Sequence, residues 1–115
     1  MRRELFVSGT AAIRGHTSVA ADDLFGQLVC TRENLHAIAI TAGAGESFGA
    51  VDGCRRHFKV FIRHEANFRA VRNDLERHLL RPEDSVIYLQ TSLCRGDLQV
   101  EIEAVLTKGG NSLPV

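Results

Sequence analysis

The sequence lacks the features that mark nucleic-acid binders, membrane proteins and secreted proteins. It has no tryptophan and only two prolines. Its 14 Lys plus Arg are balanced by 14 Asp plus Glu, so its formal net charge is zero. Binders of nucleic acid or of anionic membranes depend on clustered excess basic residues. No apolar run approaches the roughly 18 residues of a membrane span, and the two N-terminal arginines precede no apolar signal-peptide region. We therefore expect no nucleic-acid partner and no membrane partner.

Cysteine and histidine are too few and too scattered to form a metal site. Three cysteines stand far apart without a CxxC pair, and five histidines show no HxxxH or HExxH spacing. An odd number of widely spaced cysteines is typical of a cytoplasmic protein with free thiols. We expect no metal and no other cofactor.

What is present is one ordinary globular domain. At 44% hydrophobic and 24% charged residues, the 115-residue chain has the composition of a folded protein. We predict a single domain over residues 1–107 and a flexible tail over 108–115. A near-neutral surface also favours self-association.

Apolar periodicity predicts two helices and four strands. The helices are 20–42, with an apolar face through Leu24, Leu28, Leu35 and Ile38, and 65–80. Thr17 or Ser18 is the expected cap of the first helix. The strands are 3–11, 57–64, 85–94 and 98–107, the last two joined by a tight hairpin at 95–97. This order predicts an α+β fold with both helices on one face of the sheet.

The second face of the predicted sheet is neither polar nor apolar. In 98–107, alternate residues from Leu98 to Leu106 point to the helices, which places Glu101 and Glu103 on the other face. Mixed faces of this kind often pack on a symmetry mate.

Four side chains could carry chemistry, and each has a simpler interpretation. If another subunit covered Glu101 and Glu103, burial would raise a carboxyl pKa and make a general acid. From spacing alone, two solvated glutamates are the simpler interpretation. Cys94 could be a nucleophile or a small buried apolar residue. Arg72 could grip a substrate carboxylate or could be a solvated helix residue.

Three blocks in order carry a family resemblance: FVSGTA at 6–11, a helix with Asp23, Gln27 and Asn34-Leu35, and CRGDLQVEIEA at 94–104. Together they resemble the Rid/YjgF superfamily. SGTAAIRGH at 8–16, FKVFIRH at 58–64 with AVR at 70–72, and YLQTSLC at 88–94 are similar to the C-terminal domain of hydroxybenzoate-forming chorismatases. The resemblance implies a Rid/YjgF-like (chorismate-mutase-like) domain with a mixed sheet. It also implies a homotrimer whose sheets form a barrel, with sites in clefts between subunits.

The resemblance also implies roles for individual residues. Glu101 matches the catalytic glutamate that protonates a vinyl or enamine carbon or positions water. Cys94 matches the cysteine of hydroxybenzoate-forming chorismatases and Gly9 a small pocket residue. The substrate-binding residues implied are Arg72, Gln90, Tyr88, Gly9 and Thr10.

Two departures from the family patterns leave three functional hypotheses. Val86 stands where Rid deaminases carry an arginine for the substrate carboxylate, and the N-terminal half of a chorismatase has no counterpart here. The first hypothesis is a chorismatase-like lyase or hydrolase acting on a small carboxylated enol ether or enamine in secondary or aromatic metabolism. The second is a Rid-type enamine/imine deaminase. The third is a non-catalytic trimeric ligand-binding or accessory subunit.

Overall fold

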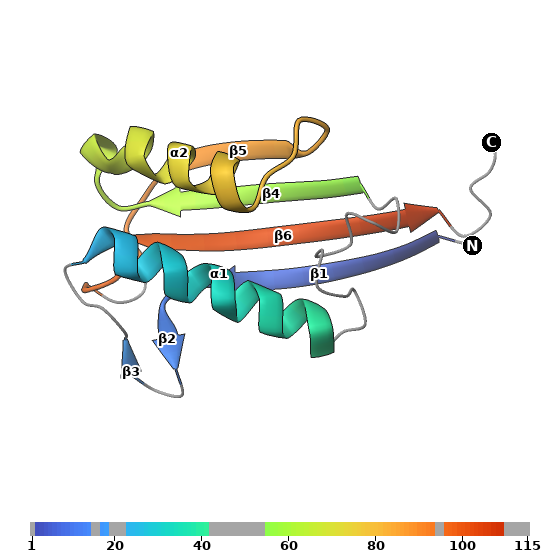
Figure 1. The fold of residues 1–115 in the computed structure, drawn as a ribbon, viewed down its shortest axis with the longest axis horizontal. Helices are drawn as coiled ribbons and strands as arrows, with labels where there is room; N and C mark the ends of the chain where they lie inside the picture. The colour runs from blue at the N-terminus through green and yellow to red at the C-terminus, as the bar shows by residue number, and fades with distance from the viewer. Residues whose placement is uncertain (1, 15–16, 19–22, 42–54, 94–95, 110–115) are drawn as a thin grey trace.

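Two helices lie across one face of a four-stranded sheet (Figure 1). The computed structural model describes residues 2–14, 17–18, 23–41, 55–93 and 96–109. The helices are α1 (Leu24–Thr41) and α2 (Phe68–His78), the latter preceded by a short 3-10 helix, η1 (Glu65–Asn67). The strands of the sheet are β1 (Arg2–Thr10), β4 (Arg55–Ile62), β5 (Ser85–Gln90) and β6 (Val100–Gly109). Two short strands, β2 (Ile13–Arg14) and β3 (Thr17–Ser18), pair with each other.

The sheet is mixed, in the order β1-β6-β4-β5. β6 runs antiparallel to both β1 and β4, whereas β5 runs parallel to β4, with α2 as the crossover between them. The predicted hairpin over 95–97 is therefore wrong, because β5 and β6 are not neighbours. A strand that returns through a helix pairs parallel with its predecessor, so β5 takes one side of β4 and leaves the other side to β6.

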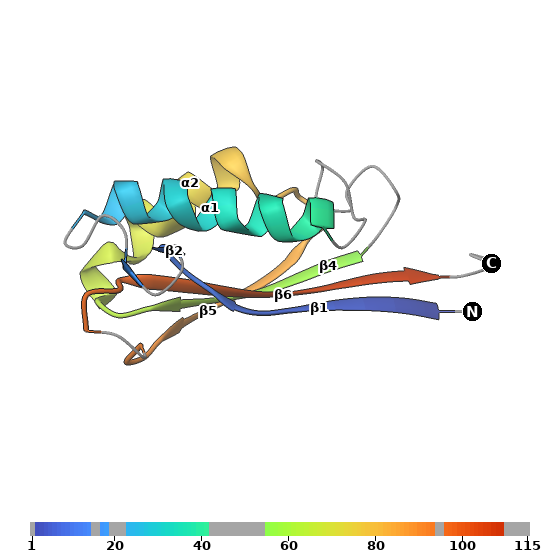
Figure 2. The ribbon, with the colours of Figure 1, turned by 90° about the horizontal axis from the view of Figure 1, so that it is seen from below.

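The core fills the space between the helices and the inner face of the sheet (Figure 2). Alternate residues of β4 and β6 are buried, as their period of two predicts. On α1, Leu28, Leu35 and Ala39 are buried, but Ile38 is 37% exposed. The inward face of α1 is thus rotated from the predicted one, because the buried positions between the leucines hold polar Gln27 and Thr31.

Asp23 caps α1. Its carboxylate oxygen Oδ1 accepts a hydrogen bond from the Gly26 N–H at 3.1 Å, and its carbonyl accepts the first helical bond from Gln27. The predicted caps, Thr17 and Ser18, instead form β3. The helix therefore begins later than the sequence pattern indicates.

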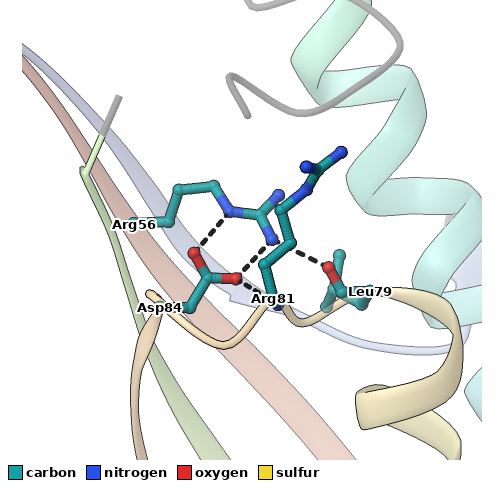
Figure 3. Close-up of polar contacts among 4 residues, drawn as sticks. All are labelled: Arg56, Leu79, Arg81 and Asp84. Carbon is teal, nitrogen blue, oxygen red and sulfur yellow. Dashed lines mark hydrogen bonds and ion pairs between the residues drawn. The ribbon is translucent and has the colours of Figure 1, made fainter. Parts of the chain in front are cut away.

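A buried ion pair joins the start of β4 to the start of β5 (Figure 3). The side chains of Arg56 and Asp84 are 2% and 4% exposed. Arg56 donates two hydrogen bonds to the Asp84 carboxylate and a third to the Leu79 carbonyl, and the Arg81 N–H also donates to Asp84. Both buried charges therefore have close hydrogen-bond partners, as a buried ion pair requires.

Neither of the two described α-helices covers the other face of the sheet (Figure 2). Large apolar side chains are exposed there: Phe6 at 63%, Ile87 at 54% and Leu89 at 41%. The register of the strands places them on the same face as Glu101 and Glu103. This face is mixed, as the sequence predicted. No described helix is both long and apolar enough to cross a membrane.

Candidate functional site

Glu101 lies on β6, on the uncovered face of the sheet. Its chain neighbours Val100 and Ile102 point into the core and are fully buried, while the Glu101 side chain is half-buried beside Phe61 of β4, its register partner. Within the described residues, no hydrogen bond or ion pair holds its carboxylate. The carboxyl group is therefore available to a ligand on this face.

Burial raises the pKa of Glu101 above its usual value near 4.5, and the nearby carboxylate of Glu103 raises that pKa further. Both causes disfavour the charged form. A larger fraction of Glu101 is therefore protonated near neutral pH than of an ordinary glutamate, which is the condition for a general acid.

Gly9 makes room for the Glu101 carboxylate. A β-bulge places Ser8 and Gly9 of β1 opposite the single residue Glu103 of β6. A Cβ atom on Gly9 would lie 2.7 Å from the Cδ of Glu101 and closer still to its Oε2. Glycine thus suits this position because of the close approach of a side chain. The structure brings these two predicted site residues together.

Thr10 belongs to the inner face. Its side chain is only 7% exposed, it pairs in register with the buried Ile102, and its hydroxyl donates a hydrogen bond to the Ser8 carbonyl at 3.0 Å. The Thr10 hydroxyl therefore supports the bulge and does not face the Glu101 carboxylate.

Tyr88 and Gln90 lie at a different part of the sheet, along the edge strand β5. Both line a cavity of about 490 Å³ together with Phe68 and Arg69. The Tyr88 ring packs edge-on against Phe68, with centroids 5.1 Å apart. Its buried hydroxyl has no hydrogen-bond partner among the described residues, and burial raises its pKa. A polar ligand in the cavity could supply the missing partner.

Arg72 lies on the exposed side of α2 and belongs with Tyr88. It forms an ion pair with Glu76 one helical turn along, at 3.1 Å, and both side chains are about half exposed. Its positive charge is close enough to oppose the rise in the Tyr88 pKa. The predicted residues therefore form two groups: Gly9 with Glu101, and Tyr88 with Gln90 and Arg72.

Cys94 lies outside the described residues, as does Cys54, while Cys30 is buried and free. Within the part of the chain that the structure describes, no three His, Cys, Asp or Glu side chains gather where they could hold a metal ion.

Polar residues whose structural role the apolar periodicity does not predict hold the segments next to the site. The fully buried Gln27 donates to the Asp97 carbonyl at 2.7 Å and accepts from the Gln99 N–H at 2.8 Å. Asn34 donates to the carbonyls of Ala11 and Ile13. The segment before Glu101 and the segment after Gly9 are thus both tied to α1. In the sequence, the sign of such an anchoring role is an amide side chain among the apolar positions of a helix.

Arg63 and Asn67 fix the same connection from the other side. Arg63 donates to the carbonyls of Leu98 and Leu93, at 2.7 and 3.3 Å, and Asn67 donates to the Gln99 side chain at 3.0 Å. The described parts of the connection between β5 and β6 are therefore held by side chains from α1, from η1 and from the residue that follows β4.

Comparison with known proteins identifies the fold. No protein-family model matches the chain. It is 36% identical over 112 residues to a 3-hydroxybenzoate synthase of Streptomyces hygroscopicus and 40% identical over 110 residues to a chorismatase of Streptomyces rapamycinicus. These matches cover 90% and 89% of the chain, but the chain spans only 31% of each relative.

Solved structures agree with these relatives. A chorismatase crystal structure aligns with a TM-score of 0.71 at 28% identity, over 90% of this chain and 32% of that one. A Rid-family protein of Yersinia pestis aligns with a TM-score of 0.70 at 20% identity, over 90% of this chain and 77% of that one. The chain therefore has the Rid/YjgF fold, and its curated homologues are chorismatases and a 3-hydroxybenzoate synthase.

Proposed function

We propose that this chain is the catalytic segment of a chorismatase-like lyase or hydrolase, acting on a small carboxylated enol ether such as chorismate, with Glu101 as the proton donor. The observation that carries the proposal is the state of Glu101: a half-buried carboxyl group with a raised pKa, seated over Gly9 in a chain whose curated homologues are chorismatases.

The reaction follows from one proton transfer. The Glu101 carboxyl donates its proton to the terminal carbon of the enol ether, and the electron pair of the double bond forms the new C–H bond. The resulting oxocarbenium-like cation lies beside the newly charged carboxylate, which stabilises it. Water adds to the cationic carbon and returns a proton to Glu101. The adduct is a hemiketal. Its bond to the ether oxygen then breaks as its hydroxyl group becomes the keto group and the hydroxyl proton passes to the departing oxygen, which releases a 2-keto acid and the ring alcohol.

The remaining predicted residues act in substrate binding. Arg72 would hold a carboxylate by charge-assisted hydrogen bonds, for which a guanidinium is well suited. Tyr88 and Gln90 offer a hydroxyl and an amide at the neighbouring cavity. Cys94 would line or assist the pocket.

A second copy of the chain would bring the two groups together. Glu101 and Tyr88 are separated by β4, about 10 Å across two strand spacings, and their side chains point to opposite faces. A homotrimer that buries Phe6, Ile87 and Leu89 would cover the exposed apolar face and place the β5 edge of one copy against the Glu101 of another. The part of the relatives beyond the matched third, on the same polypeptide or on a partner, would complete the assembly.

Substitution of Glu101 by glutamine tests the proposal. Chorismate consumption and release of the keto acid should fall by at least about 100-fold, the usual worth of a general acid, while the oligomer keeps its size in solution. Glu103→Gln removes a carboxylate of the same strand face and should keep most of the activity. An unchanged rate in Glu101→Gln would refute the role of proton donor.

One further observation favours an alternative substrate class. Rid-fold neighbours match this chain over most of their own length, which favours a Rid-type enamine/imine deaminase. Val86, half-buried against the core, offers no charge for a substrate carboxylate. Release of ammonia from a fresh imino acid, with no turnover of chorismate, would select the deaminase; no turnover of either compound would select a ligand-binding or accessory subunit.

A further inference from the structure

A second cavity, of about 530 Å³, lies between the two helices on the covered side of the sheet. Arg32 and His36 of α1 line one side, and Arg77 and Arg81 at the end of α2 and the following turn line the other. The sheet separates this cavity from Glu101, which points to the opposite face. It is therefore distinct from the proposed active site.

Two of the arginines around this cavity are already neutralised. Arg32 forms an ion pair with Asp74 at 3.1 Å, and Arg56, at the base, is paired with Asp84. Both guanidinium groups are held in place by these carboxylates. They line the cavity, but its unpaired positive charge comes from other residues.

Arg77 and Arg81 carry that free charge. Within the described residues, neither guanidinium forms a hydrogen bond or an ion pair. Arg81 uses only its backbone N–H to bind Asp84, and Figure 3 shows its side chain extending away from the Arg56–Asp84 pair. Arg77 lies in the last turn of α2, where a cation also complements the helix dipole. Arg81 lies beyond the helix, so the dipole does not account for it.

The remaining lining residues suit a small organic anion. Leu35, Leu79 and Leu80 provide apolar surface, and His36 and His78 add ring nitrogens. Glu33 is the one acidic residue among those that line the cavity. Small-molecule sites are typically about 300–1,000 Å³, mostly apolar, with a few convergent polar groups. The volume of the cavity lies in this range, and its lining is more basic than is typical, with three leucines beside four arginines and two histidines. Such a lining suits an anion.

We propose that the cavity between α1 and α2 binds a small oxyanion ligand, a carboxylate or phosphate, held by the guanidinium groups of Arg77 and Arg81. Guanidinium groups bind both kinds of oxyanion by paired, charge-assisted hydrogen bonds. The buried Arg56–Asp84 pair fixes the backbone of the turn that carries Arg81, because the Arg81 N–H donates a hydrogen bond to Asp84.

Calorimetric titration tests the proposal with two probes, pyrophosphate for the phosphate class and malonate for the carboxylate class. At about 50 mM salt, where charges are weakly screened, we expect one of the probes to bind with one site per chain. The double variant Arg77→Gln/Arg81→Gln should bind it at least about tenfold more weakly, because each charge-assisted hydrogen bond that is lost contributes to the affinity for the anion. Thermal melting should show that this exposed double variant remains folded.

Arg55→Gln is the matched control. Arg55 is an exposed arginine adjacent to Arg56 on β4, points to the opposite face and does not line the cavity. Its replacement removes one positive charge at a position outside the cavity, half of the charge that the double variant removes, so binding should change by less than about twofold. Equal weakening in Arg55→Gln, or no binding of either probe to the native chain, would overturn the proposal. Glu101→Gln should leave binding unchanged, so failure of the proposed catalytic function and failure of this site are distinguishable.

Discussion

Replacing Gly9 by alanine tests whether space at the bulge sets the position of the Glu101 carboxyl group. The new Cβ would lie 2.7 Å from the Cδ of Glu101, whereas ordinary van der Waals contact begins at 3.4 Å. The carboxyl end of the side chain must therefore move by at least about 0.7 Å. Because a misplacement of about 1 Å at a reaction centre can cost about 100-fold in rate, we expect kcat for chorismate to fall by roughly that factor.

The fold should tolerate the same substitution. The clashing atoms are the mobile end of a side chain, and the φ angle of Gly9 lies outside the left-handed region that favours glycine. A compatible Gly→Ala change restricts the unfolded chain and stabilises by about 0.4–1 kcal/mol. Urea denaturation should therefore show unchanged or slightly increased stability, so any loss of activity is local.

Carbon-13 NMR titration of the Glu101 carboxyl group supplies a readout that does not depend on activity. A carboxyl group displaced from its half-buried position should titrate at a different pH from that of the native chain, because burial is the main cause of its raised pKa. Ser8→Ala is the control, since Ser8 is exposed in the same bulge and already has a Cβ atom. If Gly9→Ala left both kcat and the titration unchanged, the proposed steric control would be wrong.

Two further predictions concern charge. Asp84→Ala leaves Arg56 buried without its carboxylate and should lower the free energy of unfolding, measured in urea, by about 3–5 kcal/mol. Glu76→Ala breaks an exposed pair and should lower it by at most about 1 kcal/mol. Similar losses of stability in the two variants would contradict the assignment of burial. The raised pKa of Glu101 favours its protonated form in the fold, so its contribution to stability is full at low pH and is lost as pH rises through that pKa. The rate should decline over the same range, and Glu103→Gln should move the decline to lower pH; a move to higher pH would contradict the electrostatic argument.

Periodicity predicted the elements of the fold well but not the pairing of its strands. Each predicted helix and strand of the sheet has a counterpart, with ends that shift by a few residues. The hairpin at 95–97 failed because Gly and Asp in a short connection are compatible with a tight turn and do not require one. The pairing follows from α2, which returns the chain so that β5 lies parallel to β4 on one edge. The other edge of β4 then pairs with β6.

The residues of the candidate site were chosen by resemblance, and spacing predicted only part of their geometry. The period of two placed Glu101 on the uncovered face correctly, but it could not reveal that Gly9 lies against its carboxyl group. That contact depends on the bulge, which puts two residues of β1 opposite one of β6. The ion pair of Arg56 and Asp84 was also out of reach, since it joins residues 28 apart whose neighbours give no sign of burial.

The buried polar residues explain how one chain can hold half of a site accurately. A buried amide without partners costs about 1–3 kcal/mol, so Gln27 is compatible with the core only while it binds the segment that leads into β6. Asn34 is satisfied in the same way by the segment that follows β1. Both anchors come from α1, a single rigid element, and they hold the two chain segments that flank Gly9 and Glu101. The backbone segments that carry Gly9 and Glu101 are therefore fixed within one chain, whereas in the proposed trimer the distance from Glu101 to a Tyr88 edge would depend on how copies of the chain assemble.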